Sequence, residues 1–392
     1  MKIILTFLSI LVVINVYSAQ TIEGEWIGRQ KENCIKLTLM IDDGTFSNGE
    51  WESSYCIEEE SFSGLVFNSE KPFTLNRDAG IISFTGKLTE TKGFGFFSFT
   101  TKKDYIEFLK DKGYGSAEVK ELLMLCLADV NKKYIEDLSR LGFSEVDVSD
   151  LISCAVFQLS IDFIEQFQGL GYTNLTIDNL VSFKIHGVDP ELVKKLSELG
   201  YRDIGASKLV ELKIHNVSPE YIQEMHTIGY KDIPLSNLVE FRIHGVNPEL
   251  VKAIIDLGYE DISASKIVEL QIHGVSPEYI KEIHAVGYKD VSLSKLVEFR
   301  IHGVDPKMIK ALIDFGYKNL SESKLVEMRI HGVTPEFIKE IHSTGLEKVT
   351  PRDLINFRIH GVDKEYIEYI FDVKKNKNIS ANKIIEYKIH DF

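Results

Sequence analysis

Histidine is the residue whose spacing in this chain could support chemistry. In one register an Ile-His pair recurs with successive copies 29 residues apart, except that the last gap is 30, at His186, His215, His244, His273, His302, His331, His360 and His390. A second set, His226, His284 and His342, has a spacing of 58 residues. An imidazole in such a position could bind zinc or act as a general base.

Repetition favours a structural role for the first set, because an active site is needed once and a structural residue in every repeat. In five successive repeats a glutamate lies four residues before the histidine, which predicts an i,i+4 pair; these are Glu211, Glu240, Glu269, Glu298 and Glu327. Histidines of neighbouring repeats would lie ~8–10 Å apart. That is too far to share a zinc with bonds of ~2 Å. The sequence contains no His-Glu-x-x-His, GxSxG or P-loop motif. We therefore predict no catalytic activity, no metal and no cofactor.

The elements that position these histidines are tandem repeats, which run from about Lys103 to the end of the chain. A glycine recurs in the same 29-residue register at Gly113, Gly142, Gly171, Gly200, Gly229, Gly258, Gly287, Gly316 and Gly345. About ten units fill this region, which predicts a solenoid. The two earliest units have Leu127-Ala128-Asp129-Val130 and Val156-Phe157-Gln158-Leu159 in place of Ile-His-Gly-Val.

The first half of each unit predicts a short amphipathic helix. In one unit Ser276 suits the N-cap, Pro277 suits the first helical position, and Gly287 ends the helix where a positive φ is needed. The N-cap position holds a capping residue in each of these units: Asp189, Ser218, Asn247, Ser276, Asp305, Thr334 and Asp363.

The second half of each unit admits two interpretations. Ser292 can cap a helix that runs to His302, and Gly303 would close it. Against this, the run from Val297 to His302 alternates apolar and polar residues, which is strand spacing. A strand here would give a βα horseshoe like that of leucine-rich repeats. We favour two helices, because the Gly-Val-Ser-Pro junction is typical of one helix ending and the next beginning.

Residues 20–102 are predicted to form a separate antiparallel β domain, either a sandwich or a small barrel. Six candidate strands are Glu25–Arg29, Ile35–Ile41, Gly49–Ile57, Phe73–Asn76, Ile81–Thr89 and Phe94–Thr100, separated by turn sequences such as RDAG. Cys34 and Cys56 lie in this region and could bridge neighbouring strands. Cys126 and Cys154 are 28 residues apart, and the sequence does not decide between a disulfide and buried thiols. The whole chain is thus of the α+β class.

Residues 1–19 resemble a secretory signal peptide. One lysine precedes an apolar run from Ile3 to Val13, and small residues follow at Ser18 and Ala19. The run is shorter than the ~20 residues that a membrane helix needs. We therefore expect an exported protein, periplasmic or extracellular, with no membrane span after cleavage. The formal net charge of -14 argues against nucleic acid as a partner.

Two stretches carry a resemblance to a known family: the region from GEWIG to GFGFFSF, and the tandem HGV-[DSNT]-P-E units. Together they resemble the extracytoplasmic C-terminal region of bacterial metallopeptidases of the beta-lactam-sensor antirepressor type. They also resemble shorter exported proteins that consist of this region alone. In the complete proteins a zinc peptidase with His-Glu-x-x-His lies in a membrane domain, which this chain lacks. The resemblance therefore implies a sensory or accessory role and not peptidase activity.

The function predicted from these features is a noncatalytic interaction scaffold that binds a protein or peptide. Candidate contact residues are those that recur on alternate repeats: Tyr221, His226, Tyr279, His284, Phe337 and His342. The other interpretation of these residues, which we favour, is packing between repeats. The alternative is a small-ligand binding protein, with an apolar molecule held in the β domain among Trp26, Trp51, Phe62 and Phe67.

Overall fold

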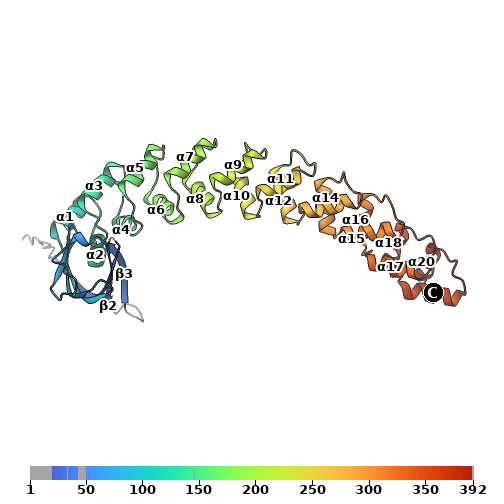
Figure 1. Cartoon of the computed structure of the whole chain (residues 1–392), viewed down its shortest axis with the longest axis horizontal. Helices are drawn as coiled ribbons and strands as arrows, with labels where there is room; N and C mark the ends of the chain where they lie inside the picture. The colour runs from blue at the N-terminus through green and yellow to red at the C-terminus, as the bar shows by residue number, and fades with distance from the viewer. Residues whose placement is uncertain (1–19, 33, 43–49, 145, 391–392) are drawn as a thin grey trace, which may run out of the picture. The chain divides into compact units, whose positions relative to one another are not determined.

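The structure is a computed structural model that describes residues 20–32, 34–42, 50–144 and 146–390, so the predicted signal peptide lies outside the described residues. A β-sheet comes first and tandem helices follow, which confirms the α+β class and the helical form of both halves of each repeat (Figure 1). The chain divides into two compact units, Met1–Val210 and Glu211–Phe392. The first contains the sheet and the first helices, and the division falls within a helix.

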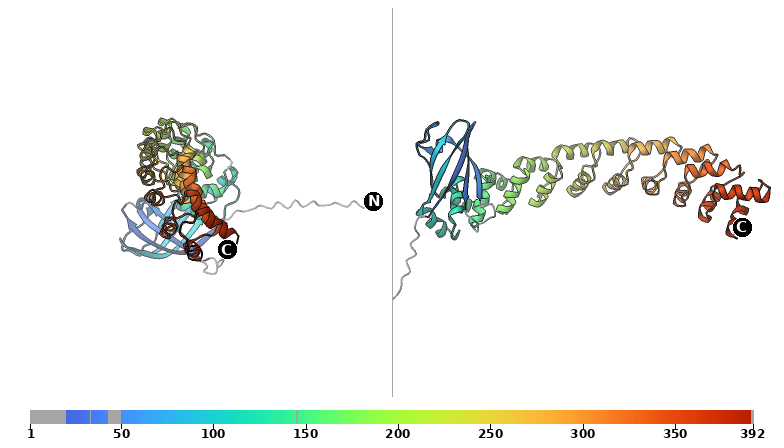
Figure 2. Two further views of the ribbon diagram at one scale, coloured as in Figure 1. Left: turned by 90° about the vertical axis from the view of Figure 1, so that its right-hand side faces the viewer. Right: turned by 90° about the horizontal axis from the view of Figure 1, so that it is seen from below.

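The sheet is a single antiparallel one that curls around its own interior (Figure 2). All six predicted strands are present, and a short seventh, β4, was not predicted. The order across the sheet is β3-β2-β1-β7-β6-β5-β4. The strands are β1 (Thr21–Lys31), β2 (Cys34–Asp42), β3 (Glu50–Ile57), β4 (Phe62–Ser63), β5 (Phe73–Arg77), β6 (Gly80–Leu88) and β7 (Gly93–Thr101), with a 3-10 turn at Glu59–Ser61.

Aromatic side chains fill the interior of the sheet. Trp26 is fully buried and packs edge-on against Phe73 and Phe84, with ring centroids 5.6 and 6.0 Å away. Phe62 is buried against the same two rings. Two of the residues proposed to hold a ligand therefore form the core of the domain. Phe67 is partly exposed, and the side chain of Trp51 is not among those described.

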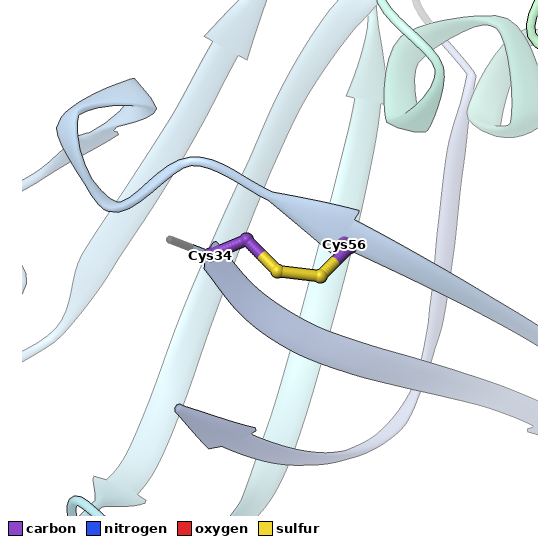
Figure 3. Close-up of a disulfide and its surroundings, with 2 residues drawn as sticks. All are labelled: Cys34 and Cys56. Atoms are coloured by element: carbon purple, nitrogen blue, oxygen red, sulfur yellow. A yellow bond between two sulfur atoms is a disulfide. The ribbon is translucent and has the colours of Figure 1, made fainter. Parts of the chain in front are cut away.

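Cys34 and Cys56 form a disulfide between β2 and β3, as the sequence allowed (Figure 3). The two strands pair antiparallel, with Lys36 opposite Cys56. The other two cysteines, Cys126 and Cys154, are free and buried. Burial raises the pKa of the Cys154 thiol to about 11, so this side chain stays protonated and unreactive at neutral pH.

The helical region alternates between two kinds of helix, which we call A and B. The A helices are α1 (Lys103–Asp111), α3 (Lys132–Arg140), α5 (Ile161–Gly169), α7 (Pro190–Glu198), α9 (Pro219–Thr227), α11 (Pro248–Ile255), α13 (Pro277–Ala285), α15 (Pro306–Asp314), α17 (Pro335–Ser343) and α19 (Lys364–Lys374). The B helices are α2 (Val119–Leu127), α4 (Val148–Val156), α6 (Ile177–His186), α8 (Ala206–Ile214), α10 (Leu235–Ile243), α12 (Ala264–Ile272), α14 (Leu293–His302), α16 (Glu322–Ile330), α18 (Pro351–His360) and α20 (Ala381–Ile389).

Helices of one kind stack on their own kind, so each compact unit has an A layer and a B layer. In the first unit α3 packs on α5, and α2 and α6 both pack on α4. Figure 1 shows α3 and α5 in one layer with α4 and α6 in the other. In the second unit the B layer runs without interruption through α10, α12, α14, α16, α18 and α20. Each repeat thus buries the apolar side of its neighbour, as in other solenoids.

The predicted caps form at both ends of the helices. Each predicted N-cap side chain accepts the backbone N–H three residues later, as Asp305 does from Met308 at 2.7 Å. The same bond is made by Asp189, Ser218, Asn247, Ser276, Thr334 and Asp363. Gly287 has φ of +105°, as the end of the A helix requires.

Gln158 occupies a position that most repeats fill with glycine. Its φ is +51°, and the equivalent Gly187 has +69°. A side chain in the left-handed region costs ~1 kcal/mol. We therefore expect Gln158→Gly to raise the free energy of unfolding of the first compact unit by up to about 1 kcal/mol. Urea denaturation followed by circular dichroism would measure this, and an unchanged or lower stability would contradict it.

Candidate interaction surface

Tyr221, Tyr279 and Phe337 are buried rather than exposed, each with only 6% of its surface accessible. The hydroxyl of Tyr279 donates to the carbonyl of Val304 at 2.7 Å, and Tyr221 makes the same bond to Val246. These bonds join an A helix to the backbone of the following repeat. The three rings are therefore poor candidates for a contact surface, because each fills space between repeats, which is the interpretation favoured from the sequence.

An arginine of the next B helix covers each of these rings. Its guanidinium carbon lies 4.7–4.9 Å from the ring centroid in the pairs Arg242–Tyr221, Arg300–Tyr279 and Arg358–Phe337. Cation–π contact therefore explains why an aromatic residue recurs at this position in every second repeat. The pairing was not predicted, since its partners lie on different helices and share no short motif.

His226, His284 and His342 are partly buried. Two of them contact a tyrosine of the preceding repeat: Nε2 of His284 lies 3.2 Å from Tyr259 Oη, and Nε2 of His342 lies 2.9 Å from Tyr317 Oη. The Tyr317 hydroxyl donates its single proton to the carbonyl of Val349 at 2.8 Å. The hydroxyl oxygen is then left to accept a hydrogen bond from His342, so we infer the tautomer in which Nε2 carries the hydrogen. The structure thus places these residues between repeats.

Burial lowers the pKa of His342, while Phe315 stacks on its ring at 4.6 Å. The unfolded chain, with an ordinary histidine pKa of ~6.5, therefore binds a proton more readily than the folded one. Stability from this group is present above pH ~6.5 and is lost as the pH falls below that value. We expect His342→Gln to reduce the loss of stability of the second compact unit between pH 7.5 and 5.5. Urea unfolding at both pH values tests this, and an unchanged loss would contradict it.

Most of the exposed large apolar residues of the second compact unit lie instead on the B layer, the exceptions being Tyr369 and Val373 of α19. The isoleucine of each Ile-His pair is 52–59% exposed. We call six of these pairs the Ile-His ladder and each pair a rung. The isoleucines of the six rungs are Ile243, Ile272, Ile301, Ile330, Ile359 and Ile389. They occupy equivalent positions on B helices that pack side by side. The same pair in the first unit, Ile185-His186, has its isoleucine 55% exposed. This surface was not identified from the sequence.

Isoleucine and histidine are the residues that do not vary among the six rungs of the ladder. The core position two residues before each isoleucine varies freely, as Phe241, Leu270, Phe299, Met328, Phe357 and Tyr387. The core position five residues before is leucine in some repeats and isoleucine in others. These two buried positions tolerate change, whereas the valine two residues after the histidine is buried and constant from Val246 to Val362. Packing accounts for a constant buried valine, but a constant isoleucine that is more than half exposed points to a requirement at the surface.

The helix ends do not depend on the histidine. In α12 the N–H of His273 donates to Glu269 and that of Val275 to Leu270, at 3.1 and 2.8 Å. In α2, where Ala128 stands in place of histidine, the equivalent two bonds form at 3.0 and 2.9 Å. The backbone bonds that close the helix therefore form with or without a histidine side chain at this position. Three of the glutamates expected to pair with it, Glu269, Glu298 and Glu327, contact a lysine three residues earlier.

In the first compact unit, the residue equivalent to a ladder isoleucine is covered by another part of the same chain. Leu127 of α2 is only 2% exposed, and α2 packs against β1, β6 and β7. Arg77 of β5 donates to the carbonyl oxygens of Cys126 and Leu127, at 2.8 and 2.6 Å. In this repeat, where the sheet covers the surface, the pair is Leu-Ala in place of Ile-His. The first compact unit therefore shows that this face of a B helix can be docked upon.

Other features of the described residues carry less information about function. Among them, no three His, Cys, Asp or Glu side chains are grouped so that they could hold a metal ion. A hollow of about 900 Å³ lies between the loops that follow α5 and α7, lined by Tyr172, Tyr201, Arg202 and Asp203. In the part of the chain that the structure describes, no helix has both the length and the apolar character to cross a membrane.

Comparisons with known proteins leave the site to be interpreted from its own geometry. The resemblance to antirepressor metallopeptidases described above remains a prediction that rests on the HGVxPE units. The sequence matches no protein-family model and no curated protein.

Proposed function

We propose that this protein is an exported, noncatalytic interaction scaffold of the cell envelope, and that its partner binds across the Ile-His ladder. The observation that supports this most directly is the combination of exposure and invariance in the ladder. Exposing an isoleucine to water has no structural benefit, and an apolar surface of this extent is typical of a binding site. The apolar run at the start of the chain and the disulfide of the β domain agree with export.

A small-ligand site inside the β domain has weaker support. The interior holds the stacked rings of Phe73 and Phe84, 4.8 Å apart, together with Trp26 and Phe62. An apolar ligand would have to displace these side chains. The scaffold therefore remains the better proposal, with a sensory or accessory role as the form that the family resemblance implies.

Crosslinking in the native envelope tests the proposal. A ladder variant carries Ile272→Ser, Ile301→Ser and Ile330→Ser in the full chain. A matched control carries Tyr369→Ser and Val373→Ser, which replace residues of α19 that are 56% and 49% exposed. We expect a specific partner of the wild-type protein to be retained by the control and reduced at least tenfold in the ladder variant. Recovery of the same partner by both variants would disprove a role for the ladder.

A further inference from the structure

We infer that the occupant of the Ile-His ladder is an extended acidic segment of another protein, in the polyproline II conformation, with an apolar residue at every third position. This inference rests on the proposed function and specifies the partner's chemistry. Two observations carry it, the charge of the B layer and the covered position in the first compact unit, together with the distance expected between neighbouring packed helices.

The spacing of the rungs selects the conformation of the ligand. Packed helices lie ~8–10 Å apart, so successive isoleucines on adjacent B helices repeat at about that distance. A polyproline II helix has three residues per turn and rises ~9 Å per turn, so one side of it meets every rung. A β-strand presents one face every ~6.7 Å, which does not match. Seven residues of an α-helix span ~10.5 Å and drift out of register along the ladder.

The charge of the B layer favours an acidic ligand. The six B helices from α10 to α20 contain ten lysine and arginine residues and seven acidic ones, although the whole chain carries a formal charge of -14. The A helices from α9 to α19 contain seven basic and eleven acidic residues. A basic residue directly precedes the isoleucine at every rung except Gln271. Several B-helix carboxylates are held by lysines, as Glu298 is by Lys295. An acidic segment would therefore be attracted to this layer and not to the A layer.

The area of the ladder fits a peptide better than a second copy of the chain. Six isoleucines at about half exposure offer roughly 600 Å² of apolar surface, below the ~800 Å² per partner of a standard protein interface. Like net charge opposes self-association. Polyproline II peptides, in contrast, lose little conformational entropy on binding and are recognised through apolar grooves. The covered position at Leu127 shows that a chain segment can approach a B helix from this side.

Fluorescence anisotropy with labelled peptides tests the inference on the full mature chain. The probe has six repeats of Leu-Pro-Glu, one for each rung. The comparison peptides are a shuffled sequence of the same composition, six repeats of Leu-Pro-Lys, and an acidic helical peptide with leucine at every seventh residue. We expect each comparison peptide to bind at least tenfold more weakly than the probe. The ladder variant should also weaken binding of the probe at least tenfold, and the α19 control should not change it.

Each other outcome overturns the inference. Equal binding of the shuffled peptide would show that spacing does not matter, and tighter binding of the helical peptide would assign a different ligand. Sedimentation velocity that finds a dimer in the wild type and a monomer in the ladder variant would assign the surface to a second copy. If no peptide binds while the ladder variant still loses its crosslinked partner, the scaffold function stands and the polyproline ligand is excluded.

Discussion

Replacing Gly95 by alanine is expected to destabilise the β domain by about 3 kcal/mol. Gly95 of β7 pairs with Gly86 of β6 and, on its other side, with Trp26 of β1. A Cβ atom at Gly95 would lie 1.8 Å from the carbonyl oxygen of Thr85 and 2.8 Å from the Cα atom of Gly86. Both atoms belong to the backbone, so no side chain can move aside and the strands must separate. The Trp26 indole, which donates to Thr85 O at 3.0 Å, would lose its bond.

Urea unfolding with two signals measures this effect. Both tryptophans of the chain, Trp26 and Trp51, lie in β strands, so their fluorescence reports the sheet, while circular dichroism at 222 nm reports mainly the helices. We expect Gly95→Ala to lower the midpoint of the fluorescence transition. The control is Gly169→Ala in α5, where an added Cβ meets nothing within 4 Å and stability should rise slightly. Equal midpoints for both variants would contradict the account.

The repeats were predictable because their information is local. The capping residue, the proline and the terminal glycine all lie within the first half of one repeat, and they recur in register. The Gly-Val-Ser-Pro junction was likewise local, and it favoured a helix over a strand in the second half of the repeat, as α14 confirms. The two-residue strand β4 is the converse case, since its two residues carry no recognisable pattern.

The interaction surface was harder to predict, because burial depends on residues distant in sequence. The sequence leaves Tyr279 open between exposure and packing between repeats, and only the structure places Arg300 over its ring. Ile301 reads as core, since it continues the apolar pattern of Val297 and Phe299, and only the packed structure shows it 57% exposed. A signal was nevertheless present in the sequence. The core positions two and five residues before the isoleucine differ among the repeats while Ile-His does not, and an exposed residue kept unchanged beside variable core positions indicates a surface requirement.

Phe299 and Ile301, two residues apart in α14, provide the sharpest test of this distinction. Phe299 is fully buried, and its replacement by alanine leaves a cavity, so we expect a loss of about 3–5 kcal/mol in the second compact unit. Because each repeat contacts only its neighbours, the damage should remain local and broaden or split the helical unfolding transition. Circular dichroism during urea denaturation would record this.

Ile301→Ala is the matched control, and its outcome bears on function as well as on stability. The side chain is more than half exposed, so we expect the free energy of unfolding to change by less than about 0.5 kcal/mol. A loss comparable to that of Phe299→Ala would mean that the ladder isoleucines are structural, and their invariance would then need no partner. If stability is unchanged, the isoleucine recurs in all six rungs of the ladder although it contributes nothing to folding. In that case the selection that preserves it acts through what the B layer binds.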